Sequence, residues 1–146
     1  MSPTEGTTAS VRRAVASALA GIAASVVFAV SAQEVTVALS GANEIPPVTT
    51  SATGTGMINV AADLTVTVRV TVSGMTPTVA HIHEAAAGSN GAIIVPLGKG
   101  ADNVWTTPPG TKLTEAQFAA FKAGNLYFNI HSEAYRSGEL RGQIKP

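Results

Sequence analysis

The chain contains three histidines, and two of them flank a single residue in the segment VAHIHE at positions 79–84. Successive side chains of a strand point to opposite faces, so His81 and His83 would share one face if this segment is a strand. The third, His131, lies in another apolar-rich segment, LYFNIHS at 126–132, which is also typical of a strand. Three neutral imidazoles from two strands can surround one copper or zinc ion. The sequence therefore predicts a shared metal site, with ordinary hydrogen-bonded histidines as the alternative interpretation.

Other polar residues near these segments could support such a site. Glu84 and Glu133 closely follow the histidine strands and could orient an imidazole through its second nitrogen, although solvated carboxylates are the favoured interpretation. Arg141 could attract an anion near a metal, but we expect a salt bridge on the last strand. The segment 43–47, NEIPP, could be a binding loop or a rigid turn. No catalytic residues are predicted, because no Ser/His/Asp arrangement, phosphate loop or paired-carboxylate site stands out.

The elements that must position the histidines are predicted to be short strands. The clearest is 64–72, where Leu and Val alternate with Thr and Arg over nine residues. This period of two is typical of a half-buried strand, and the segment pairs with 55–61 around a turn at Ala62 and Asp63. Further strands are predicted at 34–39, 79–84, 92–97, 126–131 and 139–144.

One helix is predicted, at 114–123. Thr114 and Gln117 fit a capping box at its start, and Gly124 suits its end. The segment 98–110 is expected to be a loop whose Trp105 covers the edge of the core. The chain is therefore predicted to be all-β, an antiparallel Greek-key-like sandwich or barrel with one short helix.

The first 32 residues are typical of a secretory signal peptide. Arg12 and Arg13 precede an uncharged apolar run at 14–30, and Val-Ser-Ala at 30–32 fits a signal-peptidase site. A membrane anchor is the alternative, because the run is at the short limit of a span. The expected mature protein is a single domain of residues 33–146 in the periplasm or secreted, without membrane attachment after cleavage.

Composition excludes several classes of partner. Residues 33–146 contain seven Lys and Arg against eight Asp and Glu, a formal charge of −1 without a basic patch. Nucleic acid is therefore not an expected partner. The chain has no cysteine, which rules out disulfides and thiolate metal sites.

Three motifs, in order, resemble the CHRD (chordin) domain family. They are LSGANEIPPV at 39–48 followed by ATG, AHIHE at 80–84, and LYFNIHS at 126–132 followed by GELRGQI at 138–144. In animal chordin, copies of this domain lie in an extracellular protein that antagonises growth factors. The resemblance implies an exported, non-catalytic binding module with an unidentified protein or envelope partner.

The segment 81–84 also resembles the His-x-His strand that supplies two copper ligands in copper/zinc superoxide dismutase, and His131 would match another copper ligand. The zinc ligands, the bridging histidine and the cysteines of that family have no counterpart here. The resemblance thus implies a copper-only site of His81, His83 and His131, with Cu(II) preferred over zinc. Alternative functions are periplasmic copper storage, delivery or detoxification, or a weak superoxide dismutase-like activity.

Overall fold

The computed structural model describes residues 33–146, and the predicted signal peptide lies outside them. Within this part the chain forms eight strands, one α-helix and one 3-10 helix. In chain order they are β1 (Gln33–Leu39), η1 (Gly41–Asn43), β2 (Thr53–Val60), β3 (Val66–Ser73), β4 (Pro77–Glu84), β5 (Ala92–Lys99), β6 (Val104–Thr106), α1 (Glu115–Lys122), β7 (Leu126–Ser132) and β8 (Leu140–Ile144).

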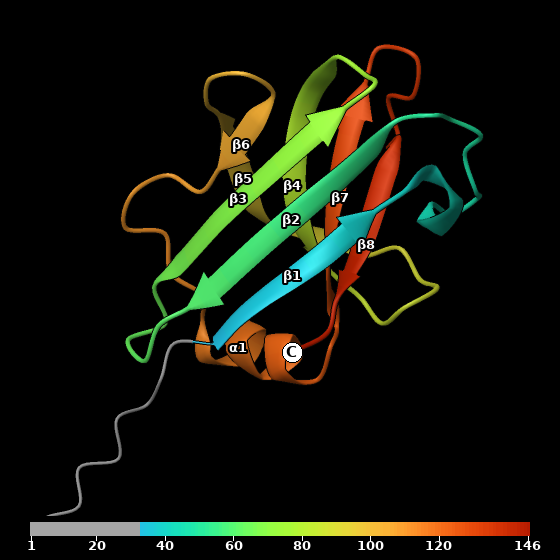
Figure 1. The fold of residues 1–146 in the computed structure, drawn as a ribbon. Coiled ribbons are helices and arrows are strands. Elements are labelled where there is room, and N and C mark those ends of the chain that lie inside the picture. Colours follow the sequence, from blue (N-terminus) through green and yellow to red (C-terminus); the bar gives the residue numbers. More distant parts are fainter. Residues whose placement is uncertain (1–32) are drawn as a thin grey trace, which may run out of the picture.

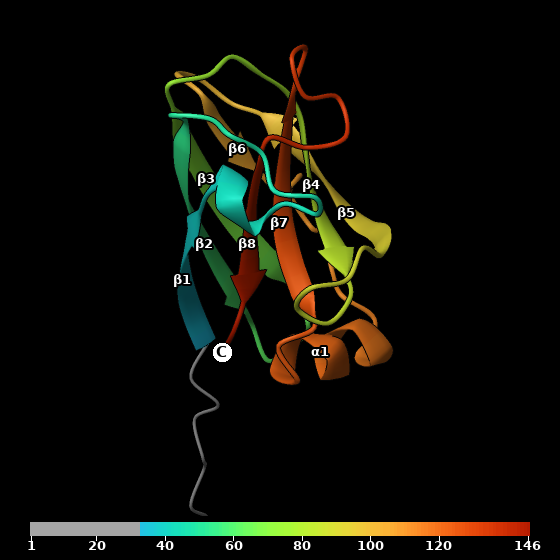
Figure 2. The same ribbon diagram turned by 90° about the vertical axis from the view of Figure 1, so that its right-hand side faces the viewer.

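The strands form a folded sheet with two facing layers (Figures 1 and 2). The hydrogen-bonded order is β1-β2-β3-β6-β5-β4-β7-β8, with every neighbouring pair antiparallel. Short β6 pairs with both β3 and β5 and so links the layers. On the other side Ser40 and Arg141 exchange two backbone hydrogen bonds of 3.1 Å, which nearly close the barrel. The predicted antiparallel sandwich or barrel with one short helix is confirmed.

The core lies between the two layers and is lined by alternate residues of each strand. In β4, Ala80 and Ile82 are buried, and in β7 the inward residues are Leu126, Phe128 and Ile130. Burial of these apolar side chains fixes which face of each strand points outward, because the side-chain period of a strand is two. The histidines of both strands are consequently on the outer face.

Two local predictions were wrong. The strand predicted from residue 64 begins at Val66, because Leu64 has a positive φ of 67° and belongs to the turn. The predicted loop at 98–110 contains β6, whose Trp105 is 4 % exposed and lies in the core cluster. Trp105 therefore fills the core rather than covering its edge.

Helix α1 covers one end of the two layers (Figure 1). Its start has the predicted capping box: the backbone N–H of Gln117 donates to Thr114, and the backbone N–H of Thr114 donates to the Gln117 side chain. The φ of Gly124, 74°, allows the chain to leave the helix. Phe121 of α1 is fully buried against the core. Among the described residues, no helix is long and apolar enough to cross a membrane.

Close packing of the two layers depends on a glycine of β2. A Cβ on Gly56 would lie 2.5 Å from the ring of Phe128, which is completely buried and cannot move aside cheaply. We expect Gly56→Ala to lower the free energy of unfolding by about 1–3 kcal/mol, measured by urea denaturation. Gly98→Ala is the matched control, because the nearest atom to its new Cβ is 3.8 Å away. Equal losses in the two variants would contradict this packing.

Candidate metal centre

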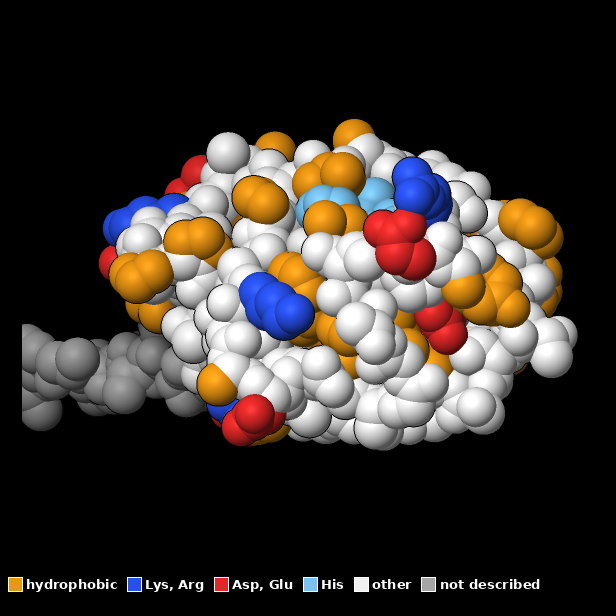
Figure 3. Space-filling view, turned by 90° about the horizontal axis from the view of Figure 1, so that it is seen from above, with side chains coloured by type: hydrophobic (Ala, Val, Ile, Leu, Met, Phe, Trp, Pro, Cys, Tyr) orange, Lys and Arg blue, Asp and Glu red, His pale blue; other side chains and the backbone are white. Residues whose placement is uncertain are grey.

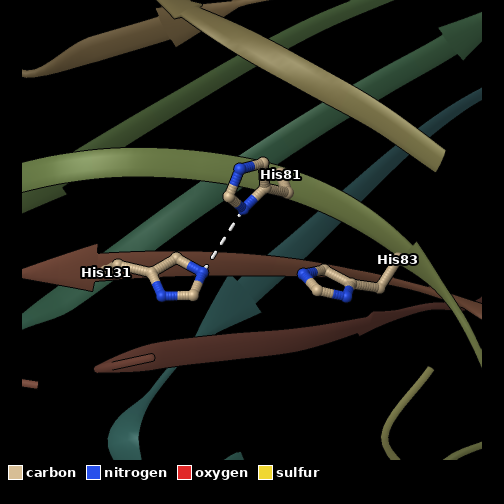
Figure 4. A group of neighbouring side chains, drawn as sticks. All are labelled: His81, His83 and His131. Carbon is tan, nitrogen blue, oxygen red and sulfur yellow. Dashed lines mark hydrogen bonds between the residues drawn. The ribbon is translucent and has the colours of Figure 1, made fainter. Parts of the chain in front are cut away.

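The three histidines meet on the outer face of the β4–β7 pair (Figure 4). Val79 of β4 pairs with His131 of β7, and the next outward residues of β4 are His81 and His83. The ring of His81 lies 5.2 Å from that of His131 and 5.7 Å from that of His83, nearly perpendicular to both. All three side chains are half-buried. The sequence prediction that these residues converge is thus met by the geometry.

Backbone carbonyls define which nitrogen of two rings carries the proton. Nδ1 of His83 lies 2.9 Å from the Gly91 oxygen, and Nδ1 of His131 lies 2.8 Å from the Arg136 oxygen. A carbonyl can only accept, so each Nδ1 donates its N–H and each neutral ring keeps a lone pair on Nε2. Outer partners of this kind orient metal-ligating histidines.

The third ring, His81, turns its Nδ1 toward another histidine instead of a carbonyl. Nδ1 of His81 lies 3.3 Å from Nε2 of His131. Because that Nε2 is an acceptor, His81 donates from Nδ1 in the metal-free protein. To bind a metal through Nδ1, His81 must carry its proton on Nε2 instead.

The donor atoms fit one ion with a small adjustment. One ring nitrogen of each histidine lies within 4.8 Å of those of the other two. An ion at ~2.0–2.1 Å from each of three nitrogens in a trigonal arrangement would hold them about 3.6 Å apart, so the widest pair must close by up to about 1.2 Å, which rotation of the rings can supply. His83 Nε2 is also buried without a hydrogen-bond partner among the described residues. An orphaned buried acceptor costs free energy, which a bound cation would recover.

Burial lowers the pKa of both histidines of β4 from the usual 6.5. For His81 the positive charge of protonated His131 and His83 adds to the effect. For His83 the Gly91 carbonyl opposes it in part, and the charges of His131 and Arg141 favour it. The two rings therefore remain neutral, and able to bind a cation, to lower pH than a free imidazole.

The carboxylates near the histidine strands do not hold the rings. Glu84 is exposed at the end of β4, and Glu133 pairs with Arg136 at 2.5 Å on the surface. Solvated carboxylates were the favoured interpretation of both. Backbone carbonyls of Gly91 and Arg136 fill the orienting role instead.

A stack of three side chains supports His83 from the side. The Tyr127 ring lies 4.8 Å from the His83 ring at 12°, and the Arg141 guanidinium carbon lies 3.6 Å above Tyr127. The Tyr127 hydroxyl also accepts the N–H of Gly91, whose oxygen holds His83. Tyr127 and Gly91 therefore fix the orientation of His83 together.

Arg141 does not form the salt bridge expected from the sequence. Its Nη1 donates to Asn90 Oδ1 at 2.8 Å, and its Nη2 donates to the Ser89 oxygen. None of the ion pairs among residues 33–146 includes it. Arg141 thus ties the 85–91 loop to β8, which is a role that only the folded chain reveals.

The segment 43–47 is anchored inward. Asn43 donates to the Arg141 oxygen at 3.1 Å, and Glu44 accepts a hydrogen bond from Asn129. Burial raises the pKa of Glu44, although Asn129 and the charge of Arg141 oppose the effect. These contacts favour the rigid-turn interpretation over the binding-loop one.

A groove of about 460 Å³ lies between β1, β8 and the 85–91 loop. Its lining includes Thr36, Arg141 and Lys145, but none of the histidines. The histidine cluster therefore lies outside this groove, on the open surface, where it suits a small ion better than an enclosed organic molecule.

Comparison with known proteins identified one family. The CHRD domain matches residues 35–144, which spans all eight strands apart from the first residues of β1. Neither the curated proteins nor the solved structures gave a significant match. The match covers most of the chain and includes all three histidine positions, so the chain belongs to the CHRD domain family.

Proposed function

We propose that this protein is an exported, non-catalytic CHRD-domain binding module whose ligand is one copper ion held by His81, His83 and His131. The observation that carries the proposal is the convergence of three imidazole nitrogens, one of them buried without a partner among residues 33–146. Export is supported by the leader pattern in residues 1–32.

Copper fits the donor set better than zinc does. Three imidazoles suit both ions, but a nitrogen site of given geometry binds Cu(II) more tightly than Zn(II). No fourth side-chain ligand completes a closed structural zinc site within the described residues. A site left open on one side, at the surface, suits uptake and release of an ion, which is compatible with storage, delivery or detoxification.

The direct test is copper binding by the untagged protein. We expect one copper per chain after copper supply, measured by metal analysis. His83→Ala should weaken binding by more than the ~10–100-fold loss typical of an outer partner. The fold should persist, because the ring is half-buried on the outer face.

Thr71→Ala is the matched control for this variant. It truncates an exposed, uncharged residue of β3, a strand that supplies none of the three rings, so copper affinity should be unchanged. Wild-type protein that remains metal-free after copper supply, or His83→Ala protein that binds copper normally, would refute the proposal.

Acid should weaken both the metal-free fold and copper binding. The pKa of His81 and His83 is lowered in the folded state, so the unfolded chain takes up protons first as pH falls. We expect the free energy of unfolding to decrease below about pH 6.5, and copper binding to weaken at lower pH, where the folded rings themselves take up protons. NMR titration of the metal-free protein should give both rings a pKa below 6.5. A pKa at or above 6.5 for either ring would contradict the effect of burial.

Removal of the leader gives a separate prediction about export. Cleavage after Ala32 would leave Gln33, the first residue of β1, at the new N-terminus. Intact-mass analysis of the exported protein should give the mass of residues 33–146. A mass that retains residues 1–32 would instead support the membrane-anchor alternative.

A further inference from the structure

The donor set of the copper site carries no negative charge. All three ligands are neutral imidazoles, and their hydrogen-bond partners are neutral backbone carbonyls of Gly91 and Arg136. The charged groups next to the cluster are exposed Glu84 and the surface pair Glu133–Arg136, whose charges cancel. A bound ion would therefore meet little compensation for its charge from its ligands.

A buried cation lies close behind the site. Arg141 is 3 % exposed, and its guanidinium stacks on the ring of Tyr127, which in turn stacks on the ring of His83. Its acceptors, Asn90 and the Ser89 carbonyl, are neutral. The Glu44 carboxyl offsets the charge in part, but it accepts its hydrogen bond from Asn129 and not from Arg141. Arg141 thus retains an unpaired charge that repels a second cation, and more strongly a divalent one.

Apolar side chains form the rim of the site. Val79, opposite His131, is 44 % exposed, and Ile93, opposite His83, is 52 % exposed. In the view of this face, hydrophobic side chains lie on two sides of the histidines, and a basic and an acidic side chain lie together beside them (Figure 3). These side chains offer neither a ligand atom nor a negative charge to a bound ion, so nothing in the rim offsets the cost of holding a higher charge.

We propose that the site selects Cu(I) over Cu(II) and Zn(II), with Arg141 as the residue that sets this preference by its charge. The inference rests on the proposed copper site and names the ion that it holds. A monovalent ion suffers half the repulsion of a divalent one, and a d10 Cu(I) ion accepts three ligands without added water. Cu(II) and Zn(II) would need further ligands, which the apolar rim does not offer.

The test measures the affinity of the mature protein for each ion. Cu(I) is titrated against a chromogenic Cu(I) chelator without oxygen, and Cu(II) and Zn(II) are titrated against chelators of their own. Potentiometry of the copper-loaded protein then gives the reduction potential. We expect Cu(I) to bind more tightly than Cu(II), so that the potential lies above that of the aqueous couple, and we expect excess Zn(II) not to displace Cu(I).

Variants of Arg141 test the electrostatic cause. Arg141→Gln should shift the Cu(I)/Cu(II) affinity ratio toward Cu(II) by about tenfold, which is ~59 mV in potential for one electron. Arg141→Lys keeps the charge and should retain most of the preference for Cu(I). Loss of the preference in this variant would instead indicate that the shape of the Arg141 side chain, and not its charge, is what matters. Lys112→Gln is the control, because it removes a surface charge that pairs with Asp63 beside β3.

Ile93→Glu decides the question if Arg141 variants do not fold, since this position is exposed. A carboxylate in the rim should also shift the ratio toward Cu(II). Three results would overturn this inference and leave the copper site standing: tighter wild-type binding of Cu(II) or Zn(II) than of Cu(I), an unchanged ratio in folded Arg141→Gln protein, or an unchanged ratio in Ile93→Glu. Failure to bind any copper would instead refute the proposed function.

Discussion

The register between β4 and β7 is the constraint on which the rest of the site depends. Ile82 pairs with Phe128 inside the barrel, so their outward neighbours His83 and Tyr127 must pair outside it. A slip of one residue would bury two imidazoles and expose Ile82, at a cost of roughly 1.5–3 kcal/mol for that side chain alone. The hydrophobic core therefore selects the face on which the histidines meet. The histidine cluster needs no extra element of secondary structure to bring its three rings together.

Turns then supply the orientation that the strands cannot. The strands deliver three rings to one face, but a ring can still rotate about its side-chain bonds. The carbonyls of Gly91 and Arg136 hold two rings with their Nε2 lone pairs turned inward. The third ring, that of His81, donates from Nδ1 to Nε2 of His131. In the metal-free protein a proton therefore lies between two nitrogens that would both bind the proposed ion. The three rings are thus largely oriented without an ion, and binding of the proposed copper ion would require that proton to leave its position.

The strands place the rings and the tertiary contacts orient them, and this difference explains what the sequence could predict. The alternation in β4 and β7 follows from the local hydrophobic pattern, and it led to the correct outward faces and to the expectation that the three histidines converge. The two orienting carbonyls could not be predicted, because every residue has one and only tertiary structure decides which carbonyl meets a ring. Arg141 was predicted to pair with a carboxylate by general charge rules. Its contacts with Asn90 and Ser89 require the 85–91 loop to fold over β8. Leu64 and β6 were missed for a similar reason, since tertiary packing overrode the local pattern there.

The position of His131 follows from how β7 is covered. Every residue of β7 except His131 is buried, including the outward Tyr127 and Asn129. Arg141 and the 85–91 loop cover Tyr127, and Glu44 bonds to Asn129 from the segment after η1. The covering contacts stop at His131, which is the first outward side chain of β7 open to solvent. A ligand there is backed by a strand that is packed on both faces, so its backbone is held firmly while its ring stays accessible. Rigid support beneath an open donor set allows an ion to enter from solvent without opening the fold.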